Sequence, residues 1–411
     1  MRIHAFAVSA TCAFAVSGTA LAGEPDQPAS SDLADIEAAL GRDAKPDTTT
    51  APEAPVKASG GVQSLNPDIS VIADFALAAF SDDHNYQTGG HDPTETGFNL
   101  QQLELSFGGA VDPYFRFDSH LVFGAEGFEV EEAFGTTLDL PAHLQVRAGQ
   151  FLTRFGRLNA THPHAWDFVD QPFALGRVFG GDSNRGLGAE LSWLMPLPWY
   201  VELVGSATRA DGEDTNRSFF GVNNPGVNAV RDLLYVAAIK QFFPLSADWS
   251  LAWGVSVARG PNGTGPRHGT YVYGSDVYLK YRPISRESQT QVTLQLEWLL
   301  RQRELGDATL HDFGSYAQLV YRFARRYSVG ARYEYGTPSR DSHGSVHVDD
   351  LDPTWISMRT RESLVTTFYP TEFSRLRLQG SRDSGLGQSD PIWAAFLAVE
   401  FLIGAHGAHA F

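Results

Sequence analysis

The sequence predicts an all-β protein, a transmembrane antiparallel β-barrel of about 16 strands. Three observations lead to this prediction. Segments of about ten residues alternate apolar and polar side chains, and the connections between them alternate between short and long. No apolar run long enough for a membrane-spanning helix follows the first 22 residues. A closed barrel is the other structure that pairs every backbone group inside a membrane.

Residues 1–22 have the pattern of a secretory signal peptide. Arg2 supplies a positive charge, an apolar stretch follows, and Ala20 and Ala22 precede a polar run. Serines and threonines interrupt the apolar stretch, which makes it a poor membrane anchor. The only cysteine, Cys12, lies in this segment. We therefore expect an exported chain without disulfides, located in the outer membrane of a Gram-negative bacterium.

Residues 23–66 are rich in Ala, Pro, Asp and Thr, which predicts a periplasmic tail ahead of the barrel. Between Asp32 and Leu40, the side chains of Leu33, Ile36 and Leu40 would share one face of a short helix. This piece is either part of a disordered linker or an oligomerising helix, and the sequence favours neither.

The barrel is predicted over residues 67–404. The segment YFRFDSHLVF illustrates the alternation, with Phe117 and Leu121 on one face and Asp118 and His120 on the other. A lipid-facing side and a watery lumen explain the two faces. The even number of expected strands suits a single-chain bacterial barrel. We expect them at 69–80, 98–111, 114–124, 128–137, 143–152, 186–195, 199–208, 230–243, 248–259, 271–282, 288–303, 313–324, 327–336, 357–369, 373–382 and 392–403.

The longest connection, from Thr153 to Arg185, is the third outer loop of this arrangement. Its aromatic residues, among them Trp166, Phe168 and Phe173, indicate a packed segment. We expect it to fold inward and narrow the lumen. The alternative is a surface loop with a small core of its own.

The C-terminal tail, residues 405–411, follows the amphipathic last strand and ends on Phe411. A terminal aromatic residue resembles the signal read by the barrel assembly machinery, which we expect as a partner together with outer-membrane lipid. The tail either carries this signal itself or hangs in the periplasm.

Charged residues recur on the polar faces of the strands and predict a charged lumen, because ionised side chains facing lipid would cost about 2–4 kcal/mol. The late strands supply a pore-lining basic wall of Arg301, Arg303, Arg322, Arg332, Arg359, Arg361, Arg375 and Arg377. The early strands and the third loop supply an acidic side of Glu104, Asp118, Glu129, Glu131, Asp167 and Asp170. Facing walls of opposite charge would orient polar solutes and screen ions. The alternative is that these charges pair with one another. Glu132 breaks the alternation and predicts a β-bulge.

Histidines in the predicted outer loops suggest a second kind of site. Imidazole together with carboxylate is a zinc-type ligand set. Two pairs of histidines have acidic residues close by in the sequence, namely His162 with His164 and His343 with His347. Their spacing matches no strict motif, and loop histidines are often ordinary polar residues. Zinc is the one metal or cofactor that we expect, and only if these side chains meet.

Three stretches carry a resemblance to a known family. They are LQVRAGQFLTRFGRLNATHPHAWDFVDQPF, the preceding EVEEAF and the final GAHGAHAF. They resemble porin-like outer-membrane proteins often labelled zinc-regulated or TonB-dependent receptors, and His162 to Pro172 is the most specific part. The resemblance implies outer-membrane transport, with zinc as a candidate cargo. A plugged receptor of 22 strands would use nearly all of the roughly 340 residues available, so no plug domain fits.

Composition excludes other classes of function. The formal net charge of −17 and the pI near 5.1 disfavour nucleic acid as a partner, since phosphate binding needs a basic face. No serine motif suggests a hydrolase, and we expect no enzyme activity. The leading hypothesis is a passive channel for small polar or charged solutes, with a homotrimer as a candidate assembly. The alternative is an outer-membrane zinc-binding uptake protein that uses the loop histidines.

Overall fold

A computed structural model describes residues 67–83, 86–124, 127–212, 214–223, 225–284 and 289–404. The predictions for the signal peptide (1–22), the periplasmic tail (23–66) and the C-terminal tail (405–411) lie outside these ranges. No helix in the described ranges is long and apolar enough to cross a membrane.

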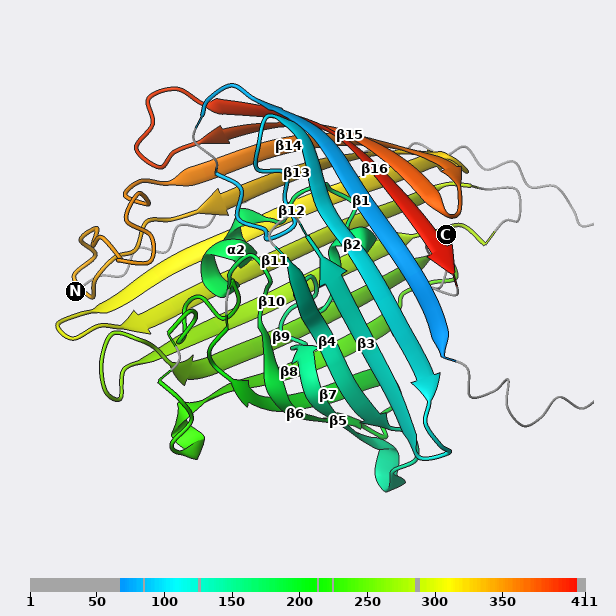
Figure 1. Cartoon of the computed structure of the whole chain (residues 1–411), viewed down its shortest axis with the longest axis horizontal. Helices are drawn as coiled ribbons and strands as arrows, with labels where there is room; N and C mark the ends of the chain where they lie inside the picture. The colour runs from blue at the N-terminus through cyan, green and yellow to red at the C-terminus, as the bar shows by residue number, and fades with distance from the viewer. Residues whose placement is uncertain are drawn as a thin grey trace, which may run out of the picture. The chain divides into compact units, whose positions relative to one another are not determined.

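Sixteen antiparallel strands form a closed barrel in which each strand pairs with its neighbours in sequence (Figure 1). The first strand, β1 (Asp68–Phe80), closes the barrel against β16 (Ile392–Gly404). The predicted fold class is therefore confirmed, and the strand limits agree within a few residues. The other strands are β2 (Gly97–Ala110), β3 (Phe115–Phe123), β4 (Phe128–Thr137), β5 (Leu144–Leu152), β6 (Arg185–Leu194), β7 (Tyr200–Arg209), β8 (Leu233–Pro244), β9 (Trp249–Pro261), β10 (Gly269–Tyr281), β11 (Gln291–Glu304), β12 (Thr309–Ala324), β13 (Tyr327–Gly336), β14 (Arg359–Thr371) and β15 (Ser374–Ser384).

The two faces of the strands differ in polarity, as the alternation predicts. On β1, Phe75 and Leu77 point outward and are exposed on the protein surface, whereas Asp74 between them is buried inside. Aromatic side chains also gather near the end with the short turns, where Phe323 packs against Tyr327 and Tyr327 against Phe368. Such a row resembles the aromatic girdle that outer-membrane barrels place at the membrane interface.

A β-bulge on β4 turns two consecutive carboxylates into the barrel. Glu132 lies opposite His120 on β3, while the next pair joins Leu121 to Val130, so Glu131 is the extra residue. Both glutamates are buried. The bulge that the sequence predicts is confirmed, and it concentrates negative charge on this part of the lumen wall.

The connection between β5 and β6, residues 153–184, folds into the barrel, as the sequence predicts. We call it the inward strap. It contains the short helix η3 (Pro163–Ala165) and helix α2 (Phe173–Phe179), which lies inside the wall and packs on β11, β12 and β13 (Figure 1). Two other short helices lie in the connections of the described residues, η2 (Pro141–His143) and η4 (Val230–Asp232). Phe155, Phe173 and Phe179 of the strap are fully buried, so the strap forms the core of the barrel.

Candidate functional site: the charged lumen

Arginines of the late strands hold the inward strap by its backbone. Arg375 donates hydrogen bonds to the carbonyl oxygens of His164 and Trp166, the latter over 2.9 Å. Arg377 donates to the carbonyl oxygen of Phe168 over 2.9 Å. Guanidinium groups carry several donors in a fixed geometry, which suits them to bind successive carbonyls. The middle of the strap, at residues 164–168, is thus attached to β15.

The carboxylate of Asp170 connects the strap to three strands of the wall. Its Oδ1 accepts hydrogen bonds from Arg332 (2.5 Å) and Gln379 (2.6 Å), and its Oδ2 accepts one from Arg361 (2.9 Å). Burial alone would raise the pKa of Asp170, but the two guanidinium groups hold that pKa below its ordinary value. The carboxylate therefore stays ionised and joins three strands to the strap.

A second anchor lies where α2 meets the outer loop between β13 and β14. Arg177 of α2 donates to Asp352 over 2.9 Å and lies over the ring of Trp355. Arg301 on β11 also donates to Asp352, over 2.8 Å. This outer loop therefore turns into the barrel and contacts helix α2 of the strap.

The arginine wall differs from the pore lining that the sequence predicts. Its side chains point inward, but seven of the eight are at most 5% exposed, while Arg322 is half-buried. The strap and the outer loops cover them, and carboxylates of the strap, the outer loops and the neighbouring strands pair with them. The physical reason is that buried guanidinium groups need hydrogen-bond partners, which the strap provides. The covered residues are Arg301, Arg303, Arg332, Arg359, Arg361, Arg375 and Arg377.

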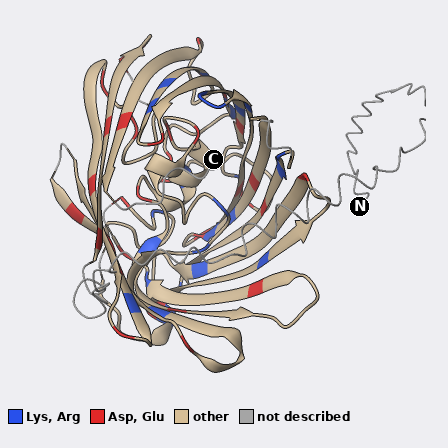
Figure 2. Ribbon diagram, turned by 90° about the vertical axis from the view of Figure 1, so that its right-hand side faces the viewer, with Lys and Arg blue, Asp and Glu red and all other residues tan. Residues whose placement is uncertain are grey.

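The acidic residues of the early strands also have close partners. Asp118 accepts a hydrogen bond from Arg116 on its own strand over 2.9 Å, and Glu129 pairs with Arg185. In the strap, burial raises the pKa of Asp167. Positive and negative residues are interspersed on the barrel wall and on the segments inside it (Figure 2). The two walls therefore form a network of ion pairs instead of two open, opposed surfaces.

Two of the four predicted zinc ligands come together with carboxylates. His164 Nδ1 lies 3.0 Å from Glu104 Oε2, and His162 Nδ1 lies 3.8 Å from the same oxygen. Burial would lower the pKa of His162, but its glutamate neighbours, Glu131 foremost, raise that pKa well above the ordinary value. Burial lowers the pKa of His164.

The other predicted pair lies elsewhere. His343 is exposed on the outer loop between β13 and β14, and His347 is half-buried there. Within the described ranges, neither belongs to a group of three or more side chains that could hold a metal ion. Asp349, which the sequence places close to this pair, is bound instead to Arg303 on β11.

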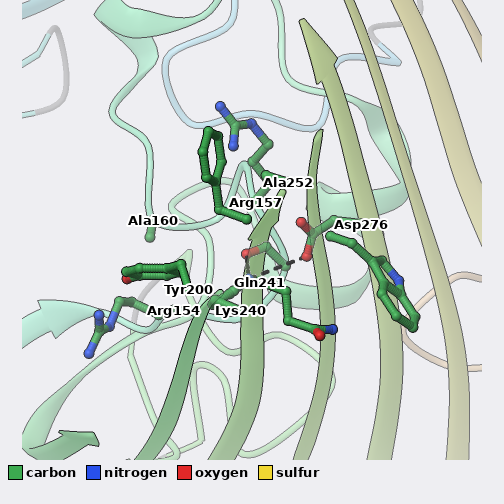
Figure 3. A pocket seen from close by; sticks show the side chains of 11 residues that line it. Arg154, Arg157, Ala160, Tyr200, Lys240, Gln241, Ala252 and Asp276 are labelled. Carbon is green, nitrogen blue, oxygen red and sulfur yellow. Dashed lines mark hydrogen bonds and ion pairs between the residues drawn. The ribbon is translucent and has the colours of Figure 1, made fainter. Parts of the chain in front are cut away.

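A cavity of about 450 Å³ remains inside the barrel between the start of the strap and strands β7 to β10 (Figure 3). Arg154, Arg157 and Ala160 line it from the strap, and Lys240 and Asp276 line it from the wall. Lys240 and Asp276 form an ion pair of 3.2 Å across it. The strap thus leaves a space beside β7 to β10 whose lining combines these charged groups with the side chains of Tyr200, Phe242 and Trp253.

The contact between the first outer loop and the strap is expected to depend on pH. Asp92 accepts a hydrogen bond from the backbone N–H of Gln171 over 2.8 Å. Burial raises the pKa of Asp92 to about 7, and the negative charge of Asp170 is the second cause. A carboxyl group whose pKa is raised in the fold makes its full contribution to stability below its ordinary pKa near 4. That contribution is lost as the pH rises towards 7. In the parent protein, backbone amides at 86–92 should therefore exchange hydrogen faster at pH 8 than at pH 5, after correction for intrinsic rates.

An Asp92→Asn variant should reduce this pH dependence, and Asp83→Asn, an exposed change in the same loop, should leave it intact. Hydrogen exchange measured by mass spectrometry provides the comparison. An unchanged pH dependence in the Asp92→Asn variant would refute the assignment.

Comparisons with known proteins place the chain in a family. No protein-family model matches it. A protein of Aquifex aeolicus described as uncharacterized is 30% identical over 395 residues, covering 84% of this chain and 80% of that protein. The chain belongs to the same family as this protein. The shared length includes most of the barrel, so the family has the barrel in common.

Solved outer-membrane proteins share the fold at low sequence identity. The channel DcaP of Acinetobacter baumannii has a TM-score of 0.55 at 13% identity, covering 82% of this chain and 96% of DcaP. An anion-selective porin from Comamonas acidovorans and the trimer form of OmpT from Vibrio cholerae each have a TM-score of 0.52 at 9% identity. Each covers 82% of this chain and 99% of the solved chain. The fold of this chain is thus that of outer-membrane porin-like barrels.

Several residues of the site carry no signal in the sequence. Arg177 and Asp352 are far apart in the chain, and their ion pair inside the barrel follows no local spacing. Glu132 is signalled only as a break in the alternation. The strap's aromatic residues indicate packing, but they do not indicate which wall the strap contacts.

Proposed function

We propose that this protein is a porin-like channel of the outer membrane, through which small polar or charged solutes diffuse passively. The observation that supports this proposal most directly is the cavity of about 450 Å³ that the inward strap leaves beside β7 to β10. Its lining combines the cations Arg154, Arg157 and Lys240 with the carboxylate of Asp276. Such a lining can replace part of the hydration of a polar solute.

The fold supports the same proposal. DcaP is described as an outer membrane channel and the Comamonas protein as an anion-selective porin. We extend the proposal to export by the signal peptide at residues 1–22, to insertion in outer-membrane lipid by the barrel assembly machinery, and to a homotrimer, the state named for OmpT of Vibrio cholerae.

Swelling of liposomes that contain the purified protein tests passive passage. Small sugars should cause swelling, and the rate should fall as the solute approaches the size of the cavity. Liposomes with heat-denatured protein serve as the control. Equal rates with and without folded protein, for every solute, would contradict the proposal.

The second candidate function is zinc uptake. One observation favours it, the meeting of His162 and His164 with Glu104 inside the lumen. Zinc entry into liposomes loaded with a fluorescent chelator measures it directly. Uptake should exceed that of a general cation such as magnesium, and a His162→Ala/His164→Ala variant should lose the difference. Equal rates for both metals would remove this candidate.

A further inference from the structure

Three histidines and three glutamates gather where the strap passes β2, β3 and β4. His162 and His164 come from the strap, Glu104 from β2, His120 from β3, and Glu131 and Glu132 from the bulge of β4. Five of the six side chains are at most 13% exposed, and that of His120 is 19% exposed. Each element brings a ligand type that divalent transition metals prefer.

The spacing of three donor atoms, from Glu104, His162 and His164, suits a single ion, and the carboxylate of Glu131 lies beside His162. His162 Nδ1 lies 3.2 Å from Glu131 Oε2 and 3.8 Å from Glu104 Oε2, and His164 Nδ1 lies 3.0 Å from Glu104 Oε2. Around tetrahedral zinc, with bonds of about 2.1 Å, neighbouring donor atoms lie about 3.4 Å apart. The separations among Glu104, His162 and His164 therefore suit zinc ligands. Glu131 contacts His162 alone in this set, so it would join as a fourth ligand by a rotation of its side chain.

Two of these atoms lack a hydrogen bond. Neither His162 Nδ1 nor Glu131 Oε2 makes one, although both are buried and face each other. An unsatisfied buried polar atom costs free energy, commonly about 1–3 kcal/mol. A bound cation would satisfy both atoms at once.

The outer partners are those that support metal ligands in other proteins. Glu132 Oε2 lies 2.8 Å from His162 Nε2, which orients the ring so that Nδ1 points at Glu131. His120 Nδ1 lies 2.9 Å from the second oxygen of Glu104. Carboxylate–histidine pairs of this kind fix the ring and raise its basicity as a ligand.

We propose that Glu104, His162 and His164 bind one divalent transition-metal ion, with zinc the best fit, and that the side chain of Glu131 turns to the ion as the fourth ligand. This ion fastens the inward strap to β2 and β4. The arginines of β13 to β15 hold the strap on one side of the lumen, and the ion holds it on the other. The site is a fixed structural site, so it rests on no assumption about which solutes pass through the barrel. The zinc-uptake candidate differs because it makes the ion a cargo.

Isothermal titration calorimetry with zinc ions, on the full refolded protein stripped with a chelator, tests the site. We expect one ion per chain, weak or no binding of magnesium, and visible absorption bands of four-coordinate cobalt when cobalt(II) is used as the probe. The His162→Ala/His164→Ala variant should bind zinc at least a hundredfold more weakly. The matched control, His343→Ala/His347→Ala, should bind like the parent protein.

Two further variants keep the test meaningful if the alanine pair disturbs folding. Glu131→Gln preserves volume and removes one ligand charge, and Glu132→Gln removes the outer partner of His162. The Glu132→Gln variant should bind zinc about 10- to 100-fold more weakly than the parent protein. The heat-dependent shift of folded barrels in electrophoresis verifies folding. Failure of the folded parent to bind zinc would overturn the proposal, as would loss of binding only in the His343→Ala/His347→Ala control.

Fastening of the strap has its own readout. Addition of zinc should slow hydrogen exchange at residues 159–168 of the parent protein and have no such effect on Glu131→Gln. Zinc binding without any change in exchange at these residues would overturn the fastening role. Channel conductance without zinc is measured separately, so a failed zinc site and a failed channel give different results.

Discussion

Replacement of Asp170 by alanine is expected to raise the single-channel conductance severalfold. The carboxylate holds Arg332, Arg361 and Gln379. Its removal takes away the partner that the two guanidinium groups share and leaves Arg332 with Glu334 and Arg361 with Asp383. Breaking a buried ion pair in this way costs about 3–5 kcal/mol. The structural change with the lowest free-energy cost is a movement of the strap away from the wall. This movement admits water to both arginines and widens the lumen.

Recordings in planar lipid bilayers measure the effect. Asp390→Ala is a suitable control because Asp390 is exposed in the outer loop before β16. It should conduct like the parent protein. A conductance of the Asp170→Ala variant equal to that of the parent would show that the strap does not limit the passage.

The substitution Gly149→Val is expected to prevent assembly of the barrel. Gly149 on β5 has a φ of +137°, and a Cβ atom there would lie 2.2 Å from the carbonyl oxygen of Ala133 and 2.6 Å from the Cα of Phe134. Both atoms belong to the backbone of β4, which cannot shift without breaking a short ladder from Ala133 to Thr136. Backbone strain and overpacking together cost roughly 2–6 kcal/mol.

The folded fraction after refolding into detergent, followed by electrophoresis without heating, checks this expectation. Gly149→Val should lower that fraction at least tenfold. Gly205→Val on β7 is the matched control, because a Cβ atom there meets nothing within 4 Å. Equal yields of the two variants would refute the steric account.

The sequence predicts the barrel well because a barrel strand repeats a local pattern. Phe75 and Leu77 face outward and Asp74 faces the lumen, and this alternation of period two is visible in any short window. Even the bulge leaves a local trace, since Glu131 and Glu132 cannot both face inward in a regular strand. The inward strap is signalled by its aromatic residues and its length.

The contacts inside the lumen could not be predicted in the same way. Asp170 bonds to Arg332 and Arg361, which lie far along the chain, and the pairing depends on how the closed barrel brings late strands to the strap. The sequence therefore predicts an open basic wall, whereas in the structure the strap and the outer loops cover the arginines. The zinc ligands could not be predicted for the same reason. His162 and His343 have similar neighbours in the sequence, but in the described structure His162 contacts carboxylates of β2 and β4, whereas His343 belongs to no such group.

The central claim is that the strap leaves a water-filled passage through a closed barrel of 16 strands. Recordings of the purified parent protein in planar lipid bilayers test it most directly. We expect discrete, stable conductance steps in symmetric salt, which increase in the Asp170→Ala variant and stay unchanged in Asp390→Ala. A folded protein that inserts into the bilayer and yields no conductance steps would contradict the claim.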